Sequence, residues 1–130
     1  MKPNHKLGLG ILAGIALGVA GATAIQAQQA KVAPGYVVAE VEVNDAAEFQ
    51  KYATAVPGTL APFNAKYMIR AGKITPVDGD APKGRFIVIA FDSVEKARAW
   101  EDSPAYEAIK PIRHASAKSR VFIVEGVAPQ

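Results

Sequence analysis

The stretch 103–116 contains the side chains of this chain that are best suited to ligand binding or catalysis. At about 100° per residue, Tyr106, Lys110 and Arg113 fall within a roughly 60° arc of a helix, beside a histidine. Cations and an imidazole next to a phenol could hold a carboxylate, an enolate or a phenolate. The candidate ligand-binding residues are therefore Tyr106, Lys110, Arg113 and His114, with Arg70 and Glu40 expected to reach the same cleft from the sheet.

The same side chains also have a purely structural interpretation. Lys110 and Arg113 could form a solvated helix face, or Arg113 could pair with Glu107 or Glu101 and hold the fold together. Ligand binding and this structural role both stay open at this point, and no residue is assigned as catalytic.

Other kinds of site are excluded by composition. The chain has no cysteine, so disulfides, thiolate metal sites and cysteine nucleophiles are ruled out. After residue 27 the only histidine is His114, which excludes a multi-histidine zinc site, and no metal or cofactor is expected. No Gly-x-Ser-x-Gly elbow or phosphate-binding glycine loop is present. The net charge of +3 is not gathered into a basic stripe, so no nucleic-acid partner is expected.

The polar stretch begins as a helix should. Ser103 can cap the first turn, and Pro104 suits the first helical position, where its missing N–H costs nothing. Pro111 should kink the helix or restart it, because its ring clashes with the carbonyl four residues back. The apolar side expected to face the core consists of Ala105, Ile109 and Ile112.

Other patterns predict the elements that position this helix. Apolar alternation or continuous apolar runs predict strands at 36–43, 66–71, 85–91 and 119–125. Helical spacing predicts a helix after Asp45, broken at Pro57-Gly58, and another through about 94–102. The most favoured role for the aromatic residues of the first helix and for Trp100 is in the core.

This order predicts an α+β fold, a ferredoxin-like βαββαβ sandwich with a four-stranded antiparallel sheet and helices on one face. The other sheet face would then be uncovered. It would expose Val38, Phe86 or Ile87, and Val121 or Phe122. Because a monomer rarely tolerates a large bare apolar patch, we expect a homodimer that packs two sheets face to face as an α+β barrel.

Several short blocks carry a resemblance to a known family. They are the segments 36–41, 67–72, 97–100, 103–106 and 110–113. From about residue 35 to 127 the chain resembles the family called domain of unknown function 1330. The resemblance implies a dimeric α+β barrel of ferredoxin-like halves, and it implies no reaction because the family's function is not established. Related dimeric barrels include lactone isomerases and small monooxygenases, so by fold analogy alone an enzyme here would be a cofactor-free isomerase or monooxygenase.

The first residues have the pattern of an export signal. Lys2 and Lys6 precede an apolar run, and Ala22-Thr23-Ala24 fits a small-x-small cleavage site, with a cut after Ala27 also possible. The predicted organisation is a signal peptide at 1–27, a tether at 28–34, one domain at 35–127 and a tail at 128–130. The mature protein would be periplasmic or secreted. The alternative is an uncleaved segment that anchors it to the inner membrane.

Two functions remain open from the sequence. The first is a small exported dimer that binds an acidic or phenolic molecule in a cleft near the second helix. The second is a non-catalytic structural or stress-related interaction module. The sequence does not decide whether the protein is an enzyme.

Overall fold

The computed structural model describes residues 32–130, of which 33–127 form one compact unit. The predicted signal segment and residues 28–31 of the tether lie outside the described residues. In the described part of the chain, no helix is both long enough and apolar enough to cross a membrane.

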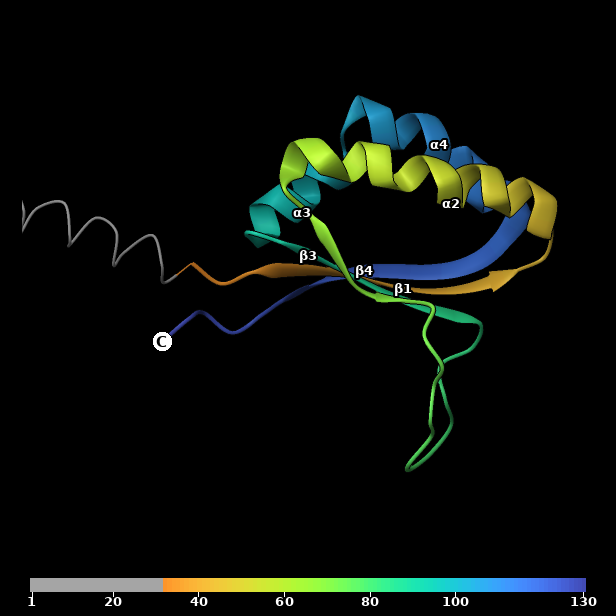
Figure 1. Cartoon of the computed structure of the whole chain (residues 1–130), viewed down its shortest axis with the longest axis horizontal. Coiled ribbons are helices and arrows are strands. Elements are labelled where there is room, and N and C mark those ends of the chain that lie inside the picture. Colours follow the sequence, from red (N-terminus) through yellow and green to blue (C-terminus); the bar gives the residue numbers. More distant parts are fainter. Residues whose placement is uncertain (1–31) are drawn as a thin grey trace, which may run out of the picture. The chain divides into compact units, whose positions relative to one another are not determined.

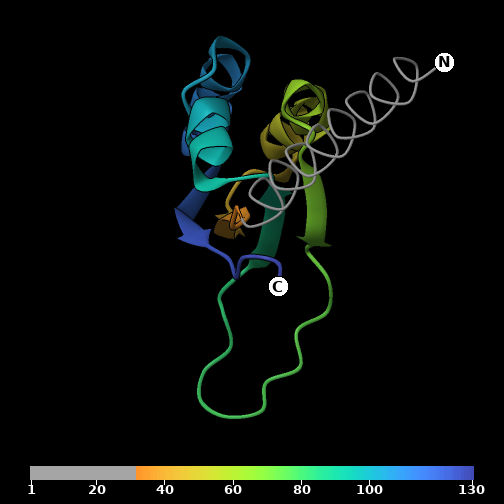
Figure 2. The same cartoon turned by 90° about the vertical axis from the view of Figure 1, so that its left-hand side faces the viewer.

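The compact unit is a four-stranded antiparallel sheet with its helices on one face (Figures 1 and 2), which confirms the predicted ferredoxin-like α+β class. The strand order is β2-β3-β1-β4. In chain order the elements are β1 (Gly35–Val43), α2 (Ala46–Leu60), the 3₁₀ turn η1 (Ala61–Phe63), β2 (Lys66–Arg70), β3 (Arg85–Phe91), α3 (Val94–Glu101), α4 (Pro104–Ser116) and β4 (Ala117–Glu125).

Side-chain caps begin each of the three α-helices that the structure describes. Asp45 accepts a hydrogen bond from the backbone N–H of Glu48 at the start of α2. Ser93 does the same for α3. Ser103 caps α4 as predicted, with Pro104 at the first helical position. Each cap satisfies a backbone donor that a helix end leaves unpaired.

The predicted break at Pro57-Gly58 is wrong, and so is a restart of the last helix at Pro111. Helix α2 runs through Pro57 to Leu60, and α4 runs through Pro111 to Ser116 without restarting. In both helices the turn after the proline is anchored in the core, by Leu60 in α2 and by Ser116 in α4. The packing of these residues outweighs the disruption that a proline causes, since tertiary contacts supply most of a helix's stability in a protein.

The core lies between the helices and the sheet. Trp100 and Tyr106 are each 1% exposed, and their ring centroids are 3.9 Å apart. The predicted core position of Trp100 is therefore confirmed. The apolar side proposed for α4 is only partly right: Ile109 packs against the core, whereas Ala105 is exposed. The buried side of α4 instead includes Tyr106 and Arg113, so two of the four polar candidates on this helix lie on the face that packs inward.

Among residues 32–130, no helix lies on the other face of the sheet. The register places Val38 opposite both Val88 and Phe122, and Tyr36 opposite Val124. Phe122 is 41% exposed and Val124 is 44% exposed. The long loop between β2 and β3 extends from the sheet on the side away from the helices (Figure 1).

Candidate functional site

The floor of the candidate site is the helix-covered face of the sheet, which changes from polar to apolar along the strands. At one end, Arg85, Val41 and Ser119 lie side by side on β3, β1 and β4. The next row is Ile87, Ala39 and Val121, and the row after that is Ile89, Val37 and Ile123. Alanine is the smallest of these side chains, so its position in the middle row leaves space above the floor.

The helices and β2 close the site above and at one side. The enclosed volume is about 50 Å³, room for roughly four waters at 10–15 Å³ each. The lining residues from these elements are Phe49, Tyr52, Ala53 and Val56 of α2, Trp100 of α3, Tyr106 and Arg113 of α4, and Tyr67 and Arg70 of β2. We call this space, with the sheet residues below it, the inner cavity.

Two tyrosine hydroxyls meet at the inner cavity. The hydroxyl oxygens of Tyr52 and Tyr106 are 2.7 Å apart and share one hydrogen bond. Burial raises the pKa of both phenols, and their mutual contact raises that of Tyr52 further. Both are therefore neutral at physiological pH. Because two phenols carry two protons and their shared bond uses only one, the second O–H can donate to a ligand.

The wall behind this pair is held rigidly. The Trp100 Nε1 donates to the Thr59 hydroxyl over 2.9 Å, and that hydroxyl donates to the carbonyl of Val56. The indole is also stacked against the Tyr106 ring. A buried Trp N–H that is satisfied in this way fixes the orientation of the ring, and with it the position of the Tyr106 hydroxyl.

Arg113 is the most unusual residue of the site. It is only 5% exposed, and its Nη1 donates to the Ser119 hydroxyl. Its Nε is buried and has no hydrogen-bond partner among the described residues. Burial lowers its pKa while Tyr106 and Tyr52 raise it, and the net shift is upward, so the guanidinium stays charged. A buried cation without a carboxylate partner is costly in a folded protein.

Arg85 approaches from the opposite side of Val41. Its Nε is also buried and unpartnered within the described part of the chain, and its guanidinium carbon lies 5.6 Å from the centre of the Phe49 ring. The preceding Gly84 has a φ of 71°, and a Cβ there would collide with the carbonyl of Val41. Glycine is therefore required for the backbone to bring Arg85 into the sheet at this point.

The inner cavity has a strongly one-sided charge. Arg70, Arg85 and Arg113 line it, while none of the described lining residues is aspartate or glutamate. Arg70 lies at the edge strand, where its guanidinium carbon is 4.5 Å from the centre of the Tyr67 ring. Arginine offers hydrogen-bond donors and no acceptor, so the polar end of the inner cavity matches an anionic group.

The predicted site residues divide into two groups. Tyr106, Arg113 and Arg70 all line the inner cavity. Lys110 and His114 do not: His114 is exposed on α4, and the Lys110 ammonium binds carboxylates outside the inner cavity.

The acidic partners proposed for Arg113 bind Lys110 instead. The Lys110 Nζ is 2.7 Å from a Glu107 carboxylate oxygen and 3.1 Å from one of Glu101. These contacts, the Glu107 hydrogen bond first, raise the pKa of Lys110. The structural pairing proposed for Arg113 is therefore wrong, because Lys110 occupies both carboxylates.

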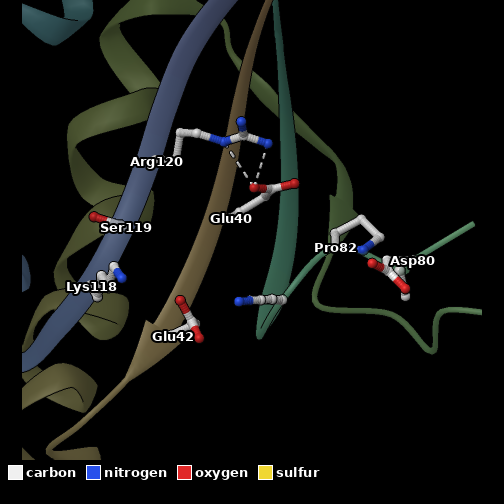
Figure 3. Close-up of a pocket in the computed structure, with 9 residues that line it drawn as sticks. Glu40, Glu42, Asp80, Pro82, Lys118, Ser119 and Arg120 are labelled. Carbon is white, nitrogen blue, oxygen red and sulfur yellow. Dashed lines mark hydrogen bonds and ion pairs between the residues drawn. The ribbon is translucent and has the colours of Figure 1, made fainter.

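Glu40 lies on the open face of the sheet, not in the cleft. Its carboxylate forms an ion pair with Arg120 (Figure 3), in which Nη2 is 2.8 Å from the nearer carboxylate oxygen. The pair borders an open hollow of about 470 Å³. This hollow is larger than the inner cavity, but its lining is balanced in charge, with Glu40, Glu42 and Asp80 against Lys83, Lys118 and Arg120. A balanced, open surface has no preference for either sign of ligand, so we place the candidate site at the inner cavity.

Several polar residues at the inner cavity were missed from the sequence, among them Tyr52, Tyr67 and Arg85, which line it, and Ser119, which accepts a hydrogen bond from Arg113. Tyr52 follows the helical spacing of core residues, and nothing local distinguishes its hydroxyl from any other. Ser119 stands at the start of an expected strand. Arg85 could have been found, because it shares the inward parity of Ile87 and Ile89 and is therefore a charge on the covered face.

Metal binding has no support in the described residues, among which no group of three or more histidine, aspartate or glutamate side chains could hold an ion.

Sequence comparison identifies the family of this chain. Residues 34–127 match the model of the domain of unknown function called DUF1330. The chain belongs to the DUF1330 family. No curated protein matches its sequence.

Solved structures similar to this DUF1330 protein share its fold at low sequence identity. The protein RPA0582 of unknown function from Rhodopseudomonas palustris has a TM-score of 0.61 at 14% identity, over 81% of this chain and 93% of that one. SnoaB, a cofactor-independent oxygenase from Streptomyces nogalater, has a TM-score of 0.55 at 14% identity, over 76% and 96%. A dimeric ferredoxin-like protein of unknown function from Thermobifida fusca has 0.51 at 19%, over 73% and 92%.

Proposed function

We propose that this protein binds a small organic anion, a carboxylate or a phenolate, in the inner cavity. The observation that carries the proposal is Arg113, a residue that is only 5% exposed, whose Nε has no hydrogen-bond partner and whose charge has no carboxylate partner in the described structure. Buried charges in proteins are normally paired, so a ligand that supplies the missing negative charge would relieve the cost of burying this one.

The shape of the inner cavity orients such a ligand. The anionic group would lie at the Arg85 end, within reach of Arg113 and of the tyrosine hydroxyls. An apolar body would lie over Ala39, toward Trp100 and Ile89. With about 50 Å³ enclosed, small anions fit directly, and a larger body must extend toward the opening of the cavity.

Binding is better supported than catalysis by the groups present. General-base catalysis needs a proton acceptor with a pKa near the working pH, and among the described lining residues there is neither a carboxylate nor a histidine. The cavity tyrosines Tyr52 and Tyr106 have raised pKa values, which makes them donors. The oxygenase activity of SnoaB belongs to that protein, and the proposal takes only the fold from the comparison.

The protein carries its own reporter for a binding test. Trp100 is the only tryptophan in the chain, and its ring lines the inner cavity. We expect formate, acetate, propionate and benzoate to change Trp100 fluorescence and to raise the melting temperature in proportion to occupancy, because a ligand that binds only the folded state stabilises it.

A charge-matched pair of variants locates the response. Arg113→Met should abolish both signals, whereas Arg98→Met, which removes a positive charge from an exposed position on α3, should leave them unchanged. If no carboxylate or phenolate affects the wild type, or if both variants respond equally, the binding proposal is wrong. The alternative of a non-catalytic interaction module would then be favoured.

We further propose that two copies pack through their open sheet faces. The supporting observations are the apolar side chains on that face, which include Val38, Phe122 and Val124. Contiguous exposed apolar surface on a sheet commonly marks an interface. The similar ferredoxin-like protein from Thermobifida fusca is itself described as dimeric.

Export remains a proposal from the sequence. The positive start, the apolar run and the small residues that end at Ala24 or Ala27 favour a cleaved signal and a periplasmic or secreted protein. The alternative stays an uncleaved segment that anchors the protein to the inner membrane.

A further inference from the structure

We propose that the inner cavity binds phenols and enols as their anions, so that a weak acid that is neutral in water gives up its proton when it enters. This inference rests on the proposed function because it concerns the same cavity. It goes further by naming the ligand class and the form that binds, since carboxylic acids are already ionised at neutral pH and phenols are not.

The charged and titratable groups that face the inner cavity are all donors at neutral pH. Helix α2 contributes Tyr52, α4 contributes Tyr106 and Arg113, β2 contributes Tyr67 and Arg70, and β3 contributes Arg85. The lining residues from β1, β4 and α3 carry no charge. The carboxylate of Glu101, whose charge contributes to raising the pKa of Tyr106, is paired with Lys110.

This set of groups distinguishes the two forms of a phenol. The O–H of a neutral phenol needs an acceptor, and arginine has none. Its anion needs donors, which the guanidinium groups of Arg113 and Arg85 and the second proton of the Tyr52–Tyr106 pair can supply. Because these donors are fixed in an apolar, largely enclosed space, their attraction for a negative oxygen is stronger than it would be in water.

The proton that the phenol loses is transferred to the solvent. None of the described residues lining the inner cavity is a carboxylate or a histidine that could take it. The balanced step is therefore the transfer of the phenol proton to buffer, accompanied by entry of the phenolate. Burial raises the pKa of Tyr52, which makes its phenolate too unfavourable to form in place of the ligand's.

4-Nitrophenol tests this step directly, because its phenolate absorbs visible light and its phenol does not. We expect excess wild-type protein to lower the apparent pKa of bound 4-nitrophenol by one unit or more. One unit means that the anion binds tenfold more tightly than the phenol, or about 1.4 kcal/mol. Calorimetry at a pH where the free phenol is protonated should show about one proton released per ligand bound, as a heat that depends on the ionisation enthalpy of the buffer.

Variants separate this charge effect from simple binding. Arg113→Met should remove the pKa change, Arg113→Lys should retain part of it, and Arg98→Met should retain all of it. If Arg113→Met fails to fold, Arg85→Met provides the same test from the other side of the inner cavity.

Two results would overturn the inference. One is binding of 4-nitrophenol with its pKa unchanged or raised, and the other is no binding of 4-nitrophenol at all. If carboxylates still shift the melting temperature in either case, the proposed function survives while the inference about phenols fails.

Discussion

Replacing Arg113 by methionine should make the unliganded protein more stable, although the residue is almost fully buried. In the described structure the guanidinium of Arg113 donates to the Ser119 hydroxyl and its central carbon lies 5.8 Å from the centre of the Tyr52 ring, but it has no carboxylate partner. A hydrogen bond to a charged group contributes about 1.5–3 kcal/mol. Burying an ion costs several kcal/mol even after the protein relaxes. Methionine fills a similar volume without that cost, so we expect a net gain of roughly 1–3 kcal/mol.

Thermal unfolding at one protein concentration measures this effect. For a domain of this size, about 1 kcal/mol corresponds to roughly 4–8 °C, so Arg113→Met should melt at least about 4 °C above the wild type. The concentration must be held constant because dimerisation would make the melting temperature depend on it. The control Arg98→Met, at an exposed position, should change the free energy of unfolding by no more than about 0.5 kcal/mol.

The opposite result would refute the reasoning. If Arg113→Met lowers the free energy of unfolding by about 3–5 kcal/mol, the guanidinium is part of a network that the fold needs, as when one partner of a buried ion pair is removed. Arg113 would then be a structural residue. Gain of apo stability together with loss of the ligand response identifies a residue retained for binding at a cost in stability.

Three further predictions concern other features of the molecule. Val38→Asp on the open sheet face should disrupt the dimer, so that light scattering detects a monomer or an aggregate, whereas Ala108→Asp at an exposed position of α4 should leave the dimer intact. A wild-type protein that is monomeric at micromolar concentration would rule out the dimer. The intact mass of the exported protein should correspond to cleavage after Ala24 or Ala27, and full-length protein found only in membranes would favour the uncleaved membrane anchor. Because burial raises the pKa of Tyr52 above 10.0, the folded state keeps a proton that the unfolded state loses, so the free energy of unfolding should fall as pH rises past 10. In urea titrations at alkaline pH, Tyr52→Phe should reduce that fall by up to about 1.4 kcal/mol per pH unit. The same slope of stability against pH in the variant and the wild type would contradict this prediction.

Local patterns in the sequence determined the elements and their order. The caps at Asp45 and Ser103 depend on bonds between residues three apart, so they were correctly predicted. The alternation of β1 correctly predicted which side of the strand is buried, with Val37 and Val41 in the core. The prolines led to wrong predictions of where the helices end. The destabilisation of a helix by Pro57 or Pro111 is a local effect, whereas the packing that overcomes it involves residues far away in the chain.

The same reasoning from local patterns identified only some of the residues of the candidate site. A helical projection brought Tyr106 and Arg113 onto one arc, which is correct, but it also included Lys110, which forms ion pairs with Glu101 and Glu107 and does not line the inner cavity. A projection shows which residues share a direction. It does not show which part of that arc is covered by another element.

The tertiary structure decided which side chains meet. Tyr52 and Tyr106 are 54 positions apart, and their hydroxyls touch because α2 and α4 lie together over the sheet. Arg85 and Ser119 flank Val41 only because β3 and β4 are its two neighbours in the strand order. The sequence alone established the residue types and the periodicity of each element, since these depend on near neighbours. Strand order and helix docking depend on contacts between distant segments, and for that reason only the folded chain defined a cavity with three arginines and no acid among its described lining residues.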